Sequence, residues 1–291
     1  MKEQPMITRR AVLATVAGMS GALAAMNLHA QESPQAAPAP EGRLKQSVSR
    51  WCFRMKLEEL AQAAKDIGLV SIDLLSLREV EKIKEFGLTC AMPNGPGRIE
   101  KGWNDPANHD ELVAKSEELL PQIAEAGLNT MIVFSGNRGG MPDSEGLQNC
   151  VKGLNRILPL AEQLGVKLVM ELLNSKRDHK DYMCDHTAWG AALAAELGPK
   201  RFGLLYDIYH MQIMEGDVIA TIQENIEYIA HFHTGGVPGR NEIDETQELN
   251  YRRIMQAIAD TGFTGYVGHE FVPAGPDPIA SLRRAFEICS V

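Results

Sequence analysis

The chain has 291 residues and a formal net charge of −9 at pH 7. It is acidic and has no run of basic residues, so a nucleic-acid backbone is disfavoured as a partner and a small molecule fits better. The cysteines are odd in number and include no CxxC pair, which argues against a disulfide framework in a domain this large and favours buried, inert thiols or a single bridge. They are Cys52, Cys90, Cys150, Cys184 and Cys289.

The first 30 residues have the pattern of a twin-arginine signal peptide. Arg9-Arg10 precede an apolar run rich in Ala and Gly over 11–26, and Ala30 offers a small residue for cleavage before Gln31. The run is shorter than the roughly 20 residues that span a bilayer, which favours cleavage over a membrane anchor. Residues 31–44 are rich in Pro and Ala and are predicted to be a disordered spacer. The sequence therefore predicts an exported, periplasmic protein with no stable membrane anchor after cleavage.

Residues 45–291 alternate between short apolar runs and helical patterns, and we predict that they form one domain. The predicted strands are 47–53, 70–75, 88–92, 130–134, 166–170, 202–207, 229–233 and 265–269. The predicted helices are 57–67, 77–86, 110–126 with a break or kink near Pro121, 145–164, 187–197, 216–226, 250–261 and 278–289. Eight strand–helix units in about 250 residues are typical of a single closed (β/α)8 barrel, the α/β fold called a TIM barrel. An open doubly wound sheet is the alternative, but no GxGxxG motif follows the first strand.

Four consecutive predicted strands each stop at a side chain that can bind a metal ion. These residues are Glu171, Asp207, His233 and Glu270. One acidic residue after a strand is often only a helix cap, but the ends of all barrel strands meet at one rim, where active sites are built. A mostly oxygen ligand set with one imidazole favours Mn²⁺, Mg²⁺ or Co²⁺, and Zn²⁺ also accepts such ligands. The sequence therefore predicts one divalent metal ion at this rim.

Three further residues lie near these strand ends. His210 follows Asp207 by three residues and either faces the barrel mouth or orients a ligand. His231 points to the same side as His233 by strand alternation, and we expect it to pack deeper in the barrel. Arg240 ends a stiff loop over 237–240, where it is either solvated or holds a substrate carboxylate through two parallel hydrogen bonds.

Aromatic residues and a polar loop are candidates for the pocket walls. The long loop after Glu171 contains His179, Asp185 and His186, a composition suited to one wall of a pocket over the barrel mouth. Trp51 and Trp103 are expected to form the pocket floor. Phe53 is expected to pack in the core.

Several segments resemble the hydroxypyruvate isomerase family of the xylose isomerase-like barrel superfamily. They are 205–217, 238–242, 247–251 and 265–271, and the resemblance extends over about residues 47–273. It implies that Glu171, Asp207, His233 and Glu270 hold one divalent metal ion. It also implies that His210 and Arg240 contact the substrate, and we add Glu242 and His186 to these predicted contacts. Hydroxypyruvate isomerases often carry Gln where this chain has His233, whereas related ketose 3-epimerases carry His.

The resemblance implies an isomerase that acts on a small sugar or hydroxy-keto acid, such as hydroxypyruvate converted to tartronate semialdehyde. Glu171 and Glu270 would be the catalytic pair, moving a proton by way of an enediolate. A ketose 3-epimerase and a sugar or inositol dehydratase-type lyase are alternatives that use the same chemistry. A periplasmic sugar-binding barrel is the alternative without catalysis. Homo-oligomers are common among such barrels, and the sequence does not specify an oligomeric state.

Overall fold

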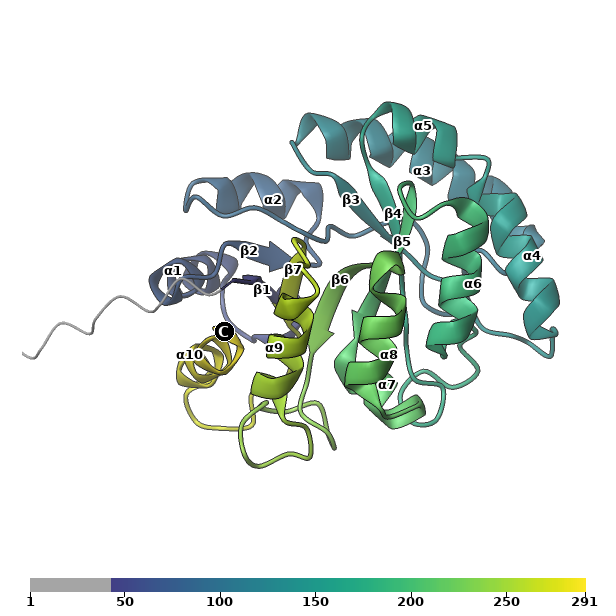
Figure 1. Ribbon diagram of the computed structural model, residues 1–291. Helices are drawn as coiled ribbons and strands as arrows, with labels where there is room; N and C mark the ends of the chain where they lie inside the picture. Colours follow the sequence, from purple (N-terminus) through teal and green to yellow (C-terminus); the bar gives the residue numbers. More distant parts are fainter. Residues whose placement is uncertain (1–42) are drawn as a thin grey trace, which may run out of the picture. The chain divides into compact units, whose positions relative to one another are not determined.

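The computed structural model describes residues 43–291 (Figure 1). The predicted signal peptide and most of the predicted spacer lie outside the described residues. Seven strands form one parallel sheet in the order β2-β1-β7-β6-β5-β4-β3. Their bounds are β1 (Lys45–Ser49), β2 (Ser71–Asp73), β3 (Thr130–Val133), β4 (Lys167–Glu171), β5 (Phe202–Asp207), β6 (Ile229–Thr234) and β7 (Tyr266–His269).

The predicted strand at 88–92 is extended, but it is not a regular strand. Backbone bonds join it to β2, with Ile72 donating to Thr89 O at 3.0 Å and Thr89 donating to Val70 O at 3.1 Å. At Ala91, side-chain hydroxyls take the place of backbone groups as hydrogen-bond partners. The Ser71 hydroxyl accepts from the Ala91 amide at 2.8 Å, and the Thr130 hydroxyl donates to the Ala91 carbonyl at 2.5 Å. The segment thus fills the eighth position between β2 and β3, and the fold is the predicted (β/α)8 barrel.

Helices cover the outer face of the sheet (Figure 1). The α-helices are α1 (Leu57–Ile67), α2 (Leu77–Lys84), α3 (His109–Glu125), α4 (Asp143–Leu154), α5 (Leu158–Gln163), α6 (Thr187–Leu197), α7 (Ile208–Met214), α8 (Val218–Asn225), α9 (Tyr251–Asp260) and α10 (Pro278–Cys289). Three short 3₁₀ helices are η1 (Arg50–Cys52), η2 (Pro106–Asn108) and η3 (Ile226–Tyr228). Between residues 43 and 291, no helix combines the length and the apolar character needed to cross a membrane.

Several predicted boundaries were wrong. The first strand ends at Ser49 and is followed by η1, and the single helix predicted over 145–164 is two helices, α4 and α5. Helix α3 runs through Pro121 without interruption. Helix α7 was not predicted. It begins directly after β5 because the Asp207 carboxylate caps it, accepting from the His210 amide at 3.1 Å.

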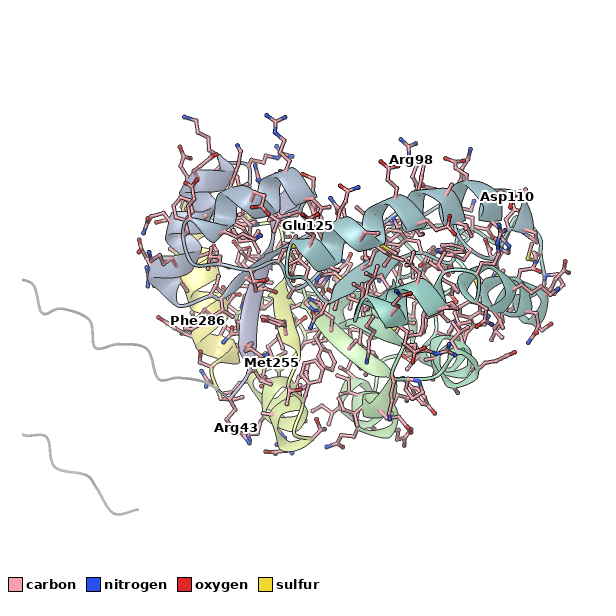
Figure 2. The ribbon with its side chains drawn as sticks, turned by 90° about the horizontal axis from the view of Figure 1, so that it is seen from above. Arg43, Arg98, Asp110, Glu125, Met255 and Phe286 are labelled. Carbon is pink, nitrogen blue, oxygen red and sulfur yellow. The ribbon has the colours of Figure 1, made fainter. Side chains whose placement is uncertain are left out.

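The main core lies between the sheet and the helices, and the barrel interior is divided into two halves. An apolar cluster of Met92, Ile132, Val169 and Leu205 is buried together in one half. The other half, toward β1, β2 and β6, contains buried polar side chains, including Ser47, Asp73 and His231. Charged side chains such as Arg98 and Asp110 lie at the periphery (Figure 2). The five cysteines are all buried and unpaired.

The loop that follows the extended segment depends on Gly95 for its close approach to β3. A Cβ atom at Gly95 would lie 1.8 Å from the carbonyl oxygen of Ile132, so Gly95→Ala must push the two backbones apart. We expect this variant to lower the free energy of unfolding by about 1–3 kcal/mol, measured by urea denaturation. Gly275→Ala is the control, because its new Cβ would have its nearest neighbour at 3.5 Å. The control should change stability by less than about 0.5 kcal/mol, and an equal loss in both variants would contradict this explanation.

Candidate active site

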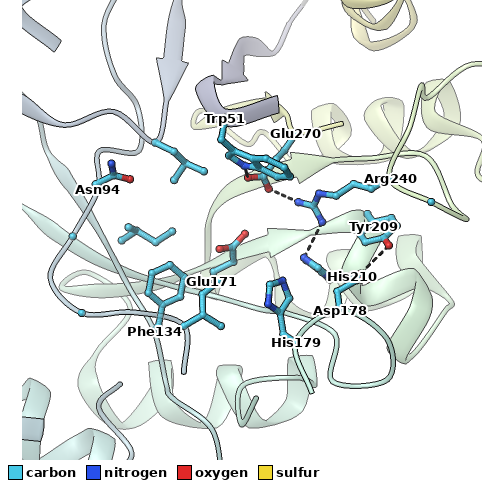
Figure 3. Close-up of a pocket in the computed structure, with 16 residues that line it drawn as sticks. Trp51, Asn94, Phe134, Glu171, Asp178, His179, Tyr209, His210, Arg240 and Glu270 are labelled. Carbon is cyan, nitrogen blue, oxygen red and sulfur yellow. Dashed lines mark hydrogen bonds and ion pairs between the residues drawn. The ribbon is translucent and has the colours of Figure 1, made fainter. Parts of the chain in front are cut away.

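A cavity of about 700 Å³ opens at the C-terminal ends of the strands (Figure 3). One side is apolar and includes Leu74, Ile99, Ile132 and Phe134. The other side carries the charged and polar groups Glu171, Asp178, His179, His210, Arg240 and Glu270. The C-terminal rim is where the active sites of such barrels lie, so this cavity is the candidate active site.

The structure brings the four predicted metal-binding side chains together beneath this cavity. Glu171 and Asp207 end β4 and β5, His233 lies in β6 and Glu270 follows β7. One ligand atom from each lies within 4.8 Å of the others, and all four residues are buried. Because parallel neighbouring strands are in register, their ends deliver these groups to one point.

The geometry of His233 indicates that these groups fit a shared cation. Its Nδ1 atom lies 2.7 Å from Glu270 Oε2 and 3.5 Å from Glu171 Oε1. Yet neither ring nitrogen makes an aligned hydrogen bond with any described residue. Ligands of an octahedral ion with bonds of about 2.1 Å are spaced about 3 Å apart without bonding to one another. The donor set and its spacing therefore suit a hard divalent cation.

The two glutamates of this group, Glu171 and Glu270, have pKa values shifted in opposite directions. Burial, reinforced by Glu270 and Asp207, raises the pKa of Glu171 to about 7. Burial acts in the same direction on Glu270, but His233 and Arg240 beside it hold its pKa well below the ordinary value. Burial opposes the charged form of His233, but Glu270, Asp73 and Glu171 raise its pKa well above the ordinary value. Two neighbouring carboxylates with opposite shifts are typical of an acid–base pair.

The guanidinium group of Arg240 is bound by other side chains of the protein and is not free in the cavity. Its Nη2 donates to Asp207 Oδ2 at 2.6 Å. The same Nη2 also donates to Glu270 Oε2, and Nη1 lies 2.8 Å from His210 Nε2 (Figure 3). Both terminal nitrogens are therefore occupied. The prediction that Arg240 presents two parallel bonds to a substrate carboxylate does not describe this arrangement.

His210 is buried and contacted on both ring nitrogens. Its Nδ1 lies 2.6 Å from Asn174 Nδ2, opposite the Arg240 contact at Nε2. Asn174 is fixed in turn, because its Oδ1 accepts from the backbone amides of Arg177 and Asp178, both at 3.0 Å. Burial, with Arg240 nearby, lowers the pKa of His210 well below its ordinary value, so the ring is neutral. A neutral imidazole accepts at one nitrogen only, so the two contacts cannot both be hydrogen bonds at once.

Two predicted substrate contacts lie outside the cavity. The His186 side chain is 52% exposed and its Nδ1 lies 2.8 Å from Asp185 Oδ1, at the start of α6. Glu242 Oε1 accepts from the amides of Ala274 and Gly275 and from the Ser281 hydroxyl, and so joins two loops. These contacts give both residues structural partners, and their substrate role stays a prediction.

The aromatic predictions had mixed outcomes. Trp103 is fully buried and packs near Gly153 rather than forming the cavity floor. Trp51 does line the cavity, and its Nε1 donates to Glu270 Oε1 at 2.5 Å. His231 is buried below His233, as expected.

Sequence reasoning missed two acidic residues that the structure connects to the site. Asp178 lines the cavity and accepts from the Tyr209 hydroxyl at 2.8 Å. Asp73 ends β2 and contacts His231 and His233. Its signal was the same as that of the four ligands, an apolar strand ending in a carboxylate, but Leu74-Leu75 continue the apolar run and conceal it.

Comparisons with known proteins agree with this fold. The family described as “Xylose isomerase-like TIM barrel” matches residues 56–288. A human protein named “Putative hydroxypyruvate isomerase” is 33% identical over 226 residues, covering 77% of this chain and 78% of the relative. A 2-oxo-tetronate isomerase of Cupriavidus necator is 35% identical over 109 residues, covering 38% of this chain and 41% of the relative.

A solved structure supports the same architecture. The crystal structure of a D-psicose 3-epimerase in the presence of D-fructose superimposes with a TM-score of 0.66 and 21% identity, covering 83% of this chain and 90% of that chain. At this identity the likeness concerns the fold. The family match spans most of the chain, and the human relative covers more than two thirds of it. The chain therefore belongs to the xylose isomerase-like TIM barrel family, among its isomerases.

Proposed function

We propose that this protein is a divalent-metal-dependent isomerase of a small hydroxy-keto acid, of the hydroxypyruvate or 2-oxo-tetronate type. One observation carries the proposal: Glu171 and Glu270 both line the cavity and both belong to the buried group of four potential ligands. The names of the relatives supply the substrate class. A cation held by Glu171, Asp207, His233 and Glu270 would supply Lewis-acid polarisation of a carbonyl group.

The side chains of this protein would move the proton. Glu270 keeps its charge because His233 and Arg240 stabilise it, so it is suited to accept a proton from the carbon beside a carbonyl. Glu171 lies 3.5 Å from the same His233 Nδ1 atom and gains a proton more readily, so it is suited to return one. Return to the neighbouring carbon produces an isomer, and return to the opposite face produces an epimer.

Two other residues are suited to orient the substrate. His210 has one contact more than a neutral ring can satisfy, so one of its nitrogens is free to exchange its partner for a substrate oxygen. Trp51 lines the cavity and holds Glu270 in place through its indole N–H.

Epimerisation of a ketose at carbon 3 is the second candidate. A cavity of about 700 Å³ has more room than a three-carbon acid needs and accommodates a six-carbon sugar. The presence of His rather than Gln at position 233 favours the same alternative. Product analysis separates the two, because an isomer and an epimer differ in which carbon carries the new hydrogen.

The central test is exchange of substrate hydrogen with solvent. Metal-loaded protein is incubated in deuterated water with hydroxypyruvate, four-carbon 2-oxo acids and ketohexoses, and products are identified by proton NMR. We expect deuterium to enter beside the carbonyl of one of these substrates. Glu270→Gln should reduce that rate by about 100- to 10,000-fold, because it removes the base.

Asp178→Asn is the matched control for this experiment. Asp178 lines the cavity but does not belong to the four potential ligands, so the variant should change KM more than the exchange rate. Exchange by Glu270→Gln at the wild-type rate, measured at saturating metal, would show that Glu270 is not the base. Substrate binding without exchange in the wild type would instead favour a sugar-binding barrel.

The binding of metal should release protons in a pH-dependent manner. Since burial and neighbouring carboxylates raise the pKa of Glu171 to about 7, this group is protonated below that pH in the metal-free protein and must lose its proton to bind a cation. His233, whose pKa is well above its ordinary value, adds a second proton at both low and neutral pH. We therefore expect about one more proton to be released per Mn²⁺ at pH 6 than at pH 8.

Calorimetry in buffers of different ionisation enthalpy measures this difference. As pH drops, Mn²⁺ affinity should fall by up to about tenfold per pH unit above about pH 7, where only His233 releases a proton, and by up to about 100-fold per pH unit below it, where Glu171 releases a second one. Glu171→Gln should remove the difference between pH 6 and pH 8, whereas Asp178→Asn should retain it. The same proton count at both pH values in the wild type would contradict the role given to Glu171.

We also propose that the protein is exported through the twin-arginine pathway. The support is Arg9-Arg10, the apolar run after them and the small residue at Ala30. Mass analysis of protein recovered from the periplasm should give a chain that begins at Gln31. Replacing Arg9 and Arg10 together by Lys should leave the precursor in the cytoplasm, and unchanged processing of that variant would oppose the proposal.

A further inference from the structure

A buried carboxylate lies inside the barrel, outside the cavity and outside the four potential ligands. Asp73 is the last residue of β2 and is fully buried. Its Oδ2 accepts from the Ser47 hydroxyl at 2.5 Å and lies 2.9 Å from His231 Nε2, and its Oδ1 accepts from the Ser71 hydroxyl at 3.0 Å. A buried carboxylate with three hydrogen-bond donors is stabilised as an anion.

Asp73, His231 and His233 also place ligand atoms within 4.8 Å of one another, which raises the question of a second cation site. The hydrogen bonds argue against it. The Ser71 hydroxyl accepts from the Ala91 amide at 2.8 Å, so its own hydrogen is directed to Asp73. With both carboxylate oxygens already accepting hydrogen bonds, the cluster serves as an anion held by donors rather than as a set of open ligands.

The anion faces the far side of the potential ligand His233. Asp73 Oδ2 lies 3.7 Å from His233 Nε2, whereas His233 Nδ1 faces Glu270 and Glu171. A distance of 3.7 Å exceeds a hydrogen bond, so the attraction is electrostatic, and it is strong because both groups are buried. Packing preserves this arrangement, since a Cβ atom at Gly268 would lie 2.7 Å from both Asp73 Oδ2 and His233 Cδ2.

We propose that Asp73 is a positioning residue for the cation site: its buried negative charge keeps a hydrogen on Nε2 of His233 and leaves Nδ1 as the atom that binds the cation. The inference rests on the proposed metal-dependent function. It follows from the general rule that a carboxylate behind a ligating imidazole fixes the position of the ring hydrogen and the orientation of the ring. No hydrogen bond between described residues performs this task for His233.

Affinity for Mn²⁺, measured by calorimetry on metal-depleted protein, tests the proposal independently of activity. Asp73→Asn keeps the size of the side chain and removes its charge, and it should raise the Kd by about 10- to 100-fold. His231→Gln is the matched control, because it disturbs the same buried cluster but leaves the Asp73 charge beside His233. The control should change the Kd by less than about threefold. An unchanged Kd in Asp73→Asn, or an equal loss in the control, would overturn the proposal.

Nitrogen-15 NMR of the wild-type protein loaded with diamagnetic Zn²⁺ supplies a readout that does not depend on whether Asp73→Asn folds. We expect the His233 ring to carry its hydrogen on Nε2 and to bind through Nδ1. A hydrogen on Nδ1 would overturn the inference while leaving the metal site intact. Wild-type protein that binds neither Mn²⁺ nor Zn²⁺ would overturn the proposed function together with this inference.

Discussion

Repulsion among three buried carboxylates is the constraint on which the rest of this site depends. Glu171, Asp207 and Glu270 each bring an oxygen to within 4.8 Å of the others, in a place that water does not reach freely. Carboxylates this close cannot all remain charged unless positive charge is supplied. The barrel supplies part of it through Arg240, whose Nη2 atom contacts both Asp207 and Glu270. Such a concentration of negative charge is costly for the fold, and its natural use is to bind a cation.

The barrel makes this arrangement by dividing its interior. Toward β3, β4 and β5, the side chains between the strands are apolar and support one wall of the cavity. Toward β1, β2 and β6, the interior contains hydroxyl, carboxylate and imidazole groups that satisfy one another below the rim. Since both carboxylate oxygens of Asp73 accept hydrogen bonds there, the barrel can bury a negative charge below the cavity. His233 connects this buried polar cluster to the potential ligands above it. Its Nε2 atom faces Asp73 and its Nδ1 atom faces Glu270.

The sequence was most informative at the strand ends, where the same short pattern recurs from one strand to the next. Parallel strands deliver their last residues to one rim, so an acid or His at four successive strand ends was enough to predict the cluster. Loops offer no such rule. His186 and Asp178 lie in the same long loop, but only Asp178 turns toward the cavity, because Asn174 caps the turn that precedes it. Side-chain hydroxyls of Ser71 and Thr130 bond to the extended segment at 88–92, and no strand pattern predicts such contacts. Helix α7 likewise depends on a cap from Asp207, which the sequence identified only as a potential ligand.

The directions of the pKa shifts show how the protein balances this charge. Burial raises the pKa of both Glu171 and Asp207, and neighbouring carboxylates raise the pKa of His233 above its ordinary value, whereas His233 and Arg240 lower the pKa of Glu270. Three negative carboxylates and one positive Arg240 leave an excess of two negative charges. One proton on Glu171 and one on the His233 ring remove that excess. A single divalent cation would remove the same excess of negative charge. It would bind to Glu171 and to the His233 ring, the two groups that otherwise hold the protons. Two protons and a divalent ion would thus balance the same charge at this site, whereas a monovalent ion would leave one buried charge unbalanced.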